Sequence, residues 1–273
     1  AVLGGDRPGY AYSRIDNPTV TALGDAIADL HAAAAGIALA TGMAAIHAGF
    51  LSLLRAGDRV LIGTVGYGTT RSQALAAFGR LGIEISYVDT TDTAAVDAAL
   101  AAAPTRLLHV ETIANPTCVV ADIPALAAAA HRHGTLLTVD NTFASPMVCR
   151  PLEHGADLVM ESATKYLSGH SDVMAGAVLG SLERIGAVRS AQIDTGATLG
   201  PFAAFLVLRG IATVAVRMER QARTAMALAT YLERQDGVRT VIYPGLPSHP
   251  QADAAARILD TGGAMLSVDL ADG

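Results

Sequence analysis

The sequence predicts an α/β protein in which a mostly parallel sheet is flanked by helices. Short apolar segments alternate with helical patterns from residue 36 to about residue 190. The apolar segments lack a clear period of two, as expected for strands that are covered on both faces. The expected strands are residues 59–62, 83–88, 107–110, 136–139, 158–160 and 175–179. Strands that alternate with helices in this way are typical of a parallel sheet wrapped by helices.

Helix signals support this pattern and indicate a second domain. A helix is expected to begin at Asp122, which can cap it, and to end near His133, which precedes a glycine. A long helical pattern at residues 212–233 leads into further strand-like segments at 238–243 and 264–268. We therefore expect an N-terminal arm at residues 1–21, a large domain at residues 22–212, and a connecting helix with the beginning of a smaller α+β domain at residues 213–273.

Composition narrows the functional classes. The chain has 273 residues, of which 51% are hydrophobic and 16% charged, as in a globular protein. The net charge of −6 and the lack of a Lys/Arg run argue against nucleic acid as a partner, and the apolar runs are too short to predict a membrane segment. Cys118 and Cys149 suit neither a disulfide framework nor a metal site, so we expect no metal and a cytoplasmic location. No G-x-G-x-x-G motif follows the first expected strand, which removes the motif-based reason to propose NAD.

Lys165 and Asp140 form the most informative pair in the chain. Lys165 stands between small hydroxyl residues after the expected strand at 158–160, and Asp140 ends the expected strand at 136–139. Taken singly, they are most simply a surface lysine and a helix cap. Together they are what pyridoxal 5'-phosphate (PLP) requires, because a lysine can form a Schiff base with this cofactor while an aspartate pairs with its pyridinium nitrogen.

Longer motifs carry a resemblance to a known family. They are YSRIDNPT at residues 12–19, VETIANP at 110–116, TVDNTFASP at 138–146, ESATKYLSGHSD at 161–172 and YPGLPSHP at 243–250. In this order they resemble the cystathionine γ-lyase, cystathionine γ-synthase and methionine γ-lyase family of PLP-dependent enzymes. The resemblance implies the fold-type I, aminotransferase-like architecture of PLP enzymes. Compared with that family, both ends of the chain are expected to be incomplete, and the arginine that binds the substrate carboxylate is expected in a further C-terminal segment.

The resemblance also implies the catalytic residues. Lys165 would form the Schiff base and then move protons, Asp140 would keep the pyridine nitrogen protonated, and Tyr67 would stack on the cofactor ring. Glu111 is expected to be structural and is left out of the catalytic set.

Further residues are expected to bind the cofactor. Thr41, Gly42 and Met43 precede an expected helix at residues 44–54, so backbone N–H groups at the helix start would face the phosphate, as helix N-termini do. The resemblance adds Ser162 and Thr164 at the phosphate and Asn115 at the cofactor's ring oxygen.

Tyr12 and Arg14 are expected to act across a subunit interface. The resemblance implies that they reach the cofactor phosphate of the neighbouring subunit, which a guanidinium can bind through two hydrogen bonds. It further implies a homotetramer built as a dimer of dimers.

The expected activity is that of a PLP-dependent carbon-sulfur lyase. The substrate would be cystathionine or a related sulfur amino acid, cleaved by α,γ- or α,β-elimination. The alternatives are γ-replacement, by a cystathionine γ-synthase or an O-acylhomoserine sulfhydrylase, and a non-catalytic PLP-binding domain of a larger protein. Thr69 stands where methionine γ-lyases have cysteine, and Ser72 stands where cystathionine enzymes usually have arginine, so the exact substrate and the choice between elimination and replacement stay open.

Overall fold

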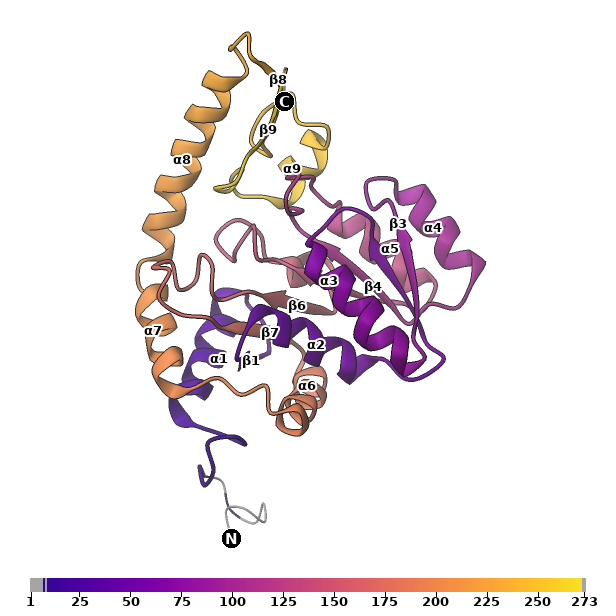
Figure 1. Cartoon of the computed structure of the whole chain (residues 1–273), viewed down its shortest axis with the longest axis vertical. Helices are drawn as coiled ribbons and strands as arrows, with labels where there is room; N and C mark the ends of the chain where they lie inside the picture. Colours follow the sequence, from indigo (N-terminus) through magenta and orange to yellow (C-terminus); the bar gives the residue numbers. More distant parts are fainter. Residues whose placement is uncertain (1–6, 8, 272–273) are drawn as a thin grey trace. The chain divides into compact units, whose positions relative to one another are not determined.

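The computed structural model describes residue 7 and residues 9–271. The first part of the predicted arm, residues 1–6 and 8, lies outside the described residues, as do residues 272–273. The chain forms two compact units (Figure 1). The first unit comprises Ala1–Leu53 and Leu158–Val214, and the second comprises Leu54–Asp157 and Ala215–Gly273. The division into arm, large domain and small domain stays a prediction.

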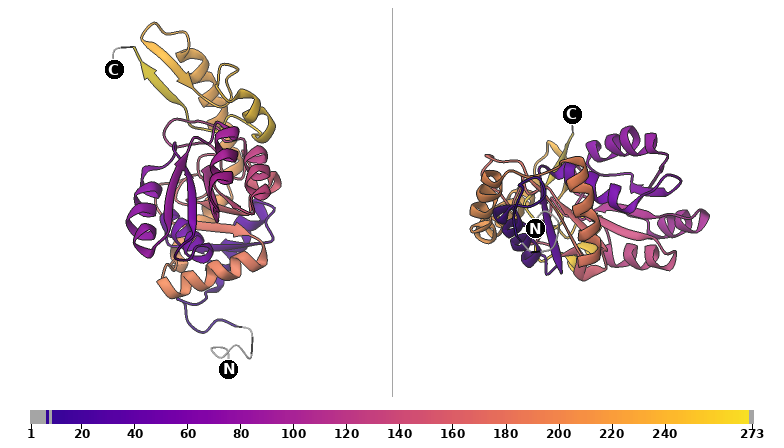
Figure 2. Two further views of the ribbon diagram at one scale, coloured as in Figure 1. Left: turned by 90° about the vertical axis from the view of Figure 1, so that its right-hand side faces the viewer. Right: turned by 90° about the horizontal axis from the view of Figure 1, so that it is seen from below.

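The first unit contains three strands and four helices among its described residues. They are α1 (Pro18–Leu30), β1 (Ala35–Leu39), α2 (Gly42–Leu53), β6 (Leu158–Glu161), β7 (Gly176–Gly180), α6 (Leu182–Thr195) and α7 (Pro201–Ile211). Strand β7 lies between β1 and β6 and is antiparallel to both. Helices α2 and α6 contact β7, and α1 contacts β1 and α7 (Figure 2).

The two antiparallel pairs of β7 are the exception within the mostly parallel arrangement that was expected. Strand β6 reaches β7 through a loop without a helix, in which the chain makes turns at residues 163–168. A parallel pair needs a long crossover, usually a helix, so the two strands run in opposite directions. Strand β1 was not among the expected strands.

The second unit carries the parallel part of the fold. Its strands in the order β3, β2, β4 and β5 pair in parallel. They are β2 (Arg59–Gly63), β3 (Glu84–Val88), β4 (Leu107–Glu111) and β5 (Leu136–Asp140). The helices among them are α3 (Gly68–Gln73), which continues as a π-helical turn (Ala74–Phe78) and a 3-10 turn (Gly79–Leu81), α4 (Thr93–Ala102) and α5 (Ile123–Arg132), with a further 3-10 turn at Pro151–His154. These strands match the expected segments to within a residue at each end.

Helix α5 has the predicted ends. The Asp122 side chain accepts a hydrogen bond from the Ala125 N–H at 3.4 Å, and the chain leaves the helix through His133 and a left-handed Gly134, whose φ is 67°. Such a capping carboxylate and left-handed glycine satisfy backbone groups that helix ends leave unpaired.

The last part of the second unit builds a small second sheet. Strands β8 (Val238–Ile242) and β9 (Ser267–Leu270) pair antiparallel, with α9 (Ala252–Ile258) between them in sequence. The preceding helix α8 (Val214–Leu232) buries Ala225 and Ala229 in a cluster with Val241 and Tyr243. The expected new sheet is therefore confirmed, although β9 begins three residues later than the predicted segment at 264–268.

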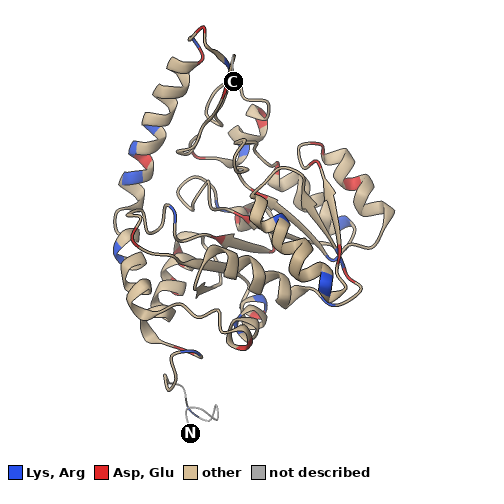
Figure 3. Ribbon diagram, in the orientation of Figure 1, with Lys and Arg blue, Asp and Glu red and all other residues tan. Residues whose placement is uncertain are grey.

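Charged residues of both signs are interspersed along the chain (Figure 3). On α8 they gather in the first turns, where Arg223 pairs with Glu219 at 3.2 Å. Among the described residues, no single helix is long and apolar enough to cross a membrane, and α7 with α8 passes that test only as a bent pair, by length and composition.

The start of α2 packs so closely on β7 that a side chain at Gly176 cannot fit. A Cβ there would lie 2.1 Å from the Thr41 carbonyl oxygen. We predict that Gly176→Ala lowers the free energy of unfolding by about 1–3 kcal/mol, because backbone must shift. At Gly186 in α6 a Cβ meets nothing within 4 Å, so Gly186→Ala should raise it by about 0.5–1 kcal/mol. Urea unfolding measures both, and a neutral Gly176→Ala variant would contradict the close approach.

Candidate functional site

The predicted site residues fall into two groups, one in each unit. The first unit holds Tyr12, Arg14, Gly42, Met43, Ser162, Thr164 and Lys165. The second unit holds Tyr67, Asn115 and Asp140.

The N-terminus of α2 meets Ser162 in the first unit. The Thr41 hydroxyl accepts the Ala44 N–H at 3.0 Å and caps the helix. A Cβ at Gly42 would lie 2.7 Å from the Ser162 Cβ and 2.9 Å from its hydroxyl oxygen, so only glycine allows this approach. Helix α2 has 12 residues and no acidic residue in its first turn, which leaves its positive end open to an anion. The N–H groups of Gly42 and Met43 and the Ser162 hydroxyl therefore suit a phosphate group.

Lys165 lies in a turn that is fastened to both neighbouring strands. Its N–H donates to the Ser162 carbonyl at 3.0 Å, and its own carbonyl accepts the Gly169 N–H at 2.8 Å. The Thr164 hydroxyl donates to the Ala175 carbonyl and accepts the Ala175 N–H, each at 3.0 Å. The Lys165 side chain is exposed, and it is the only lysine in the 273-residue sequence.

The two hydroxyls beside Lys165 thus differ in their contacts. Ser162 faces the start of α2, whereas Thr164 bonds the main chain just before β7. The part of Thr164 in phosphate binding stays a prediction.

A buried pair that sequence reasoning missed fixes the end of β6. Glu161 stands directly before Ser162. Its Oε1 and the His31 Nε2 share a hydrogen bond at 3.1 Å, and both side chains are almost fully buried. These residues are 130 positions apart, so no local pattern could pair them. Their contact joins the C-terminal end of α1 to the strand that leads to Lys165.

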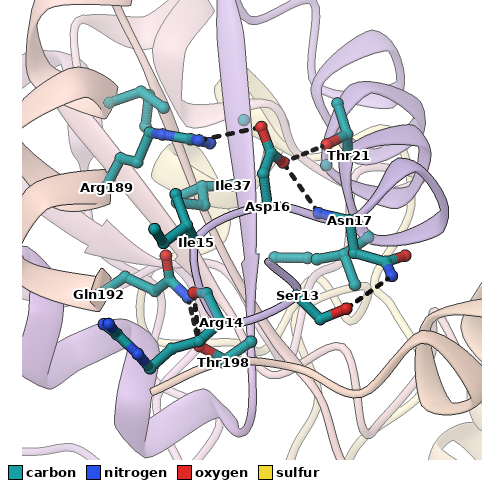
Figure 4. A pocket seen from close by; sticks show the side chains of 15 residues that line it. Ser13, Arg14, Ile15, Asp16, Asn17, Thr21, Ile37, Arg189, Gln192 and Thr198 are labelled. Atoms are coloured by element: carbon teal, nitrogen blue, oxygen red, sulfur yellow. Dashed lines mark hydrogen bonds and ion pairs between the residues drawn. The ribbon is translucent and has the colours of Figure 1, made fainter. Parts of the chain in front are cut away.

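Arg14 contacts the end of α6 and the Tyr12 ring. One Arg14 nitrogen donates to the Ile193 carbonyl at 2.8 Å, and the guanidinium lies 5.4 Å from the centre of the Tyr12 ring. Figure 4 shows the pocket lined by this segment, where Asp16 accepts hydrogen bonds from Arg189 and Thr21, each at 2.9 Å. These contacts order the described part of the arm within its own chain, and the role of Tyr12 and Arg14 across an interface stays a prediction.

Two carboxylates end neighbouring parallel strands in the second unit. Glu111 is the last residue of β4 and Asp140 the last of β5, and the two are paired in register. Residues paired in this way point to the same face of a sheet. The Asp140 carboxylate accepts the Thr142 N–H at 3.0 Å, which holds it at the strand end.

Glu111 joins the other two predicted residues of this unit. Its Oε1 accepts the N–H of Tyr67, at the start of α3, and its Oε2 accepts the N–H of Asn115 at 2.8 Å. Burial raises the pKa of the Glu111 carboxyl to about 8, the negative charge of Asp140 adds to the rise, and the two N–H groups oppose it. Sequence reasoning treated Glu111 as structural and missed its link to Tyr67 and Asn115. Its position at the end of a strand, next to Asp140, was the feature that could have indicated it.

Buried polar contacts hold these strand ends in place. Thr112, next to Glu111, donates to the Asn141 side-chain oxygen at 2.6 Å, and the Asn141 amide donates to the Cys149 carbonyl at 2.9 Å. A carboxylate at the end of a strand, held by its neighbours, can pair with a protonated ring nitrogen. A partly exposed Tyr67 can cover a flat ring.

A family model described as Cys/Met metabolism PLP-dependent enzyme matches residues 2–273. The chain therefore belongs to this family of PLP-dependent enzymes, whose members are lyases or γ-replacement enzymes that process small sulfur-containing molecules. The N–H groups of Gly42 and Met43 and the Ser162 hydroxyl would suit the phosphate of this cofactor. Among the described residues, no cluster of three or more potential metal ligands is present.

Relatives with different names resemble the chain to a similar degree. The L-methionine gamma-lyase of Pseudomonas putida is 43% identical over 275 residues, which cover 100% of this chain and 69% of the relative. The O-succinylhomoserine sulfhydrylase of Pseudomonas aeruginosa is 43% identical over 273 residues, or 100% of this chain and 68% of the relative.

Solved structures confirm the predicted fold class. The cystathionine gamma synthase of Xanthomonas oryzae pv. oryzae, solved with cystathionine, matches with a TM-score of 0.95 at 37% identity and covers 98% of this chain and 70% of that one. The cystathionine gamma-lyase of Lactobacillus plantarum, solved with L-serine, matches with a TM-score of 0.93 at 39% identity. The match covers 97% of this chain and 69% of that one.

His109, two residues before Glu111, makes the stability of the second unit depend on pH. Burial lowers its pKa from 6.5 to about 4, while Nδ1 and the Thr138 hydroxyl share a hydrogen bond at 2.9 Å. Because the unfolded chain gains a proton here near pH 6.5 and the folded chain does not until about pH 4, stability falls as pH decreases between these values. The loss would be on the order of 3 kcal/mol.

We predict that His109→Phe flattens this acid-side loss in urea unfolding measured at intervals between pH 7 and pH 4. The control His154→Gln, at a partly exposed histidine, should keep the wild-type profile. An undiminished loss in His109→Phe would show that other groups cause it.

Proposed function

We propose that the protein is a carbon-sulfur lyase that uses PLP bound to Lys165 to cleave cystathionine or a related sulfur amino acid. The observation that carries the proposal is the turn at residues 162–165, in which Ser162 accepts the Lys165 N–H and also faces the N-terminus of α2 through Gly42. A phosphate bound at Ser162 would be held by the same short segment that carries Lys165, which is the only lysine in the sequence. The family's chemistry requires both groups.

Each proposed residue has a defined task. When bound, PLP supplies an electron sink for the carbanion formed at the substrate α-carbon. Lys165 Nζ would hold the cofactor covalently and, when the substrate amine displaces it, would take the proton from that carbon. The Asp140 carboxylate keeps a proton on the ring nitrogen, and the Tyr67 ring covers one face of the cofactor.

The remaining residues orient the cofactor. Gly42, Met43 and Ser162 bind the phosphate, with Thr164 beside them. The Asn115 side chain approaches the ring oxygen. The Asn115 main chain is bonded to Glu111, and such a tether would reduce the freedom of its loop.

The polar side chains of the loop after Tyr67 contact their own unit. Arg71 donates to the Thr64 carbonyl at 3.0 Å and lies 4.8 Å from the centre of the Tyr87 ring. The Ser72 hydroxyl donates to the Gly68 carbonyl at 3.0 Å. Because Ser72 stands where cystathionine lyases and synthases alike usually have arginine, the choice between elimination and replacement is left to experiment.

The second candidate is γ-replacement on an O-acylhomoserine. It is favoured by the 43% identity to a relative named O-succinylhomoserine sulfhydrylase, which equals the identity to the methionine gamma-lyase of Pseudomonas putida. Lyases and replacement enzymes share their first steps, so the same residues would serve both. A non-catalytic PLP-binding domain is not supported, because the family is enzymatic and Lys165, Asp140 and Tyr67 are all present.

We further propose a homo-oligomer in which Tyr12 and Arg14 bind the cofactor phosphate of a neighbouring subunit, assembled as a tetramer from two dimers. The exposed Tyr12 ring and the surface position of Arg14 support this role. The boundary between the arm and the large domain would lie at residue 21, and that between the large domain and the small domain at residue 212. The free thiols of Cys118 and Cys149 accord with a reducing, cytoplasmic setting.

The activity is tested by giving the PLP-loaded protein cystathionine in one reaction and O-succinylhomoserine with cysteine in another. An oxo-acid and a free thiol from the first reaction, found by mass spectrometry, are expected for a lyase. Cystathionine from the second would establish the replacement reaction instead, and no product from either would overturn the proposal.

The same preparation tests the attachment at Lys165. Borohydride reduction should fix PLP on Lys165 in the wild type and leave Lys165→Arg unlabelled and inactive. The control is Lys165→Arg with Arg223→Lys, which places a lysine on the exposed face of α8 and should also stay unlabelled. Label on that control would reveal non-specific reduction.

The shared site is tested by mixing two inactive variants, Arg14→Ala and Lys165→Ala, after separate purification and subunit exchange. If Arg14 serves the neighbouring subunit, a hybrid dimer regains one intact site, and random exchange restores about a quarter of wild-type activity. If Arg14 serves its own subunit, the mixture stays inactive.

A further inference from the structure

Glu111 occupies the junction of the three predicted residues of the second unit. Its two carboxylate oxygens accept the main-chain N–H groups of Tyr67 and Asn115, and its Cα is paired in register with Asp140. These three residues come from the start of α3, the loop after β4 and the end of β5. A single side chain therefore connects the segments that carry Tyr67 and Asn115, beside the strand end that carries Asp140.

The neighbouring chain is shaped around this carboxylate. A Cβ at Gly66, directly before Tyr67, would lie 2.9 Å from Glu111 Oε1, so a side chain at residue 66 would push the two groups apart. The glycine lets the backbone of residues 66 and 67 come down onto the carboxylate. This close fit indicates that the connection is specific rather than a chance contact of a long side chain.

The segments keep other anchors that do not involve Glu111. Thr64 donates its N–H to the Val88 carbonyl at 2.8 Å, and Thr112 donates its N–H to the Asp140 carbonyl at 3.0 Å. The Ala114 N–H donates to the Val119 carbonyl at 2.8 Å. Loss of the Glu111 contacts should therefore free Tyr67 and Asn115 locally while the sheet stays folded.

We propose that Glu111 is a positioning residue that holds the Tyr67 ring and the Asn115 side chain in a fixed relation to the Asp140 carboxylate, and so sets how tightly and in which orientation PLP is held. The inference rests on the proposed function, because it concerns the same cofactor. Glu111 acts through its neighbours and does not itself take part in the reaction.

The charged environment is compatible with this role. The titratable or charged side chains near Glu111 are Asp140 on β5, His109 on the same strand, and Tyr67 and Arg71 on α3. With Asp140 beside it, Glu111 is the carboxyl of the pair whose pKa is raised, to about 8. Burial and the charge of Asp140 cause this rise, and the N–H groups of Tyr67 and Asn115 oppose it.

The test compares Glu111→Gln with Glu111→Asp and with Thr135→Val. The glutamine keeps one acceptor oxygen and presents an NH₂ group to the other N–H, so one of the two contacts is lost. The aspartate keeps two acceptors on a shorter chain and should rescue part of the effect. Thr135→Val removes a buried hydrogen bond to the Thr105 carbonyl just before β5, at the opposite end of that strand from Asp140, and controls for a general loss of stability.

Three readouts are made on the full chain: the PLP dissociation constant, the circular dichroism of the visible band of bound PLP, and the thermal midpoint without PLP. We expect Glu111→Gln to weaken PLP binding by about tenfold, as for the loss of one buried hydrogen bond, and to reduce the dichroism. Thr135→Val should lower the thermal midpoint and leave both PLP readouts at the wild-type values.

A double-mutant cycle separates positioning from a merely structural role. If Glu111 acts through Tyr67, the effect of Glu111→Gln on PLP affinity must be smaller when Tyr67 is already alanine. Equal effects in both backgrounds, or wild-type affinity and dichroism in Glu111→Gln, would overturn the inference.

The two proposals fail in different ways. A wild-type protein that borohydride does not label at Lys165 would overturn the proposed function and this inference with it. A wild type that is labelled, with Glu111→Gln indistinguishable from it in affinity and dichroism, would overturn the inference alone.

Discussion

The close approach of two backbone segments at Gly42 is the constraint on which the turn at residues 162–165 depends. Without a side chain at this residue, α2 begins against Ser162, and the absence of a side chain at Gly176 lets the preceding Thr41 carbonyl lie on the first residue of β7. The same contact aims the positive end of α2 at the segment that carries Lys165. The proposed phosphate site and the position of Lys165 thus depend on one packing arrangement, which glycine permits and larger residues would prevent.

The second unit solves a different physical problem, which is to keep two carboxylates side by side at the ends of parallel strands. Two adjacent negative charges repel each other, and burial of Glu111 makes its charge still more costly. The N–H groups of Tyr67 and Asn115 offset part of that cost. The same two hydrogen bonds connect the start of α3 and the loop after β4 to the end of β4.

Local pattern was sufficient for much of the fold. The apolar segments before Asp140 and Lys165 became β5 and β6, and the cap at Asp122 became the start of α5. Strand β7 was placed correctly but not its direction, since the pattern of apolar residues is the same in parallel and antiparallel strands. Strand β1 was missed because its five residues, AGIAL, are small and weakly patterned.

The sequence by itself determined the family and its cofactor, because these depend on residue types in fixed local order around strand ends. It also predicted Lys165 and Asp140 as site residues. Only the tertiary structure decided which partners Glu111, His31 and Thr164 contact. Glu111 meets Tyr67 across 44 residues and His31 meets Glu161 across 130. Such contacts arise when distant segments pack, and the energy of a buried polar group depends on the partner it finds there.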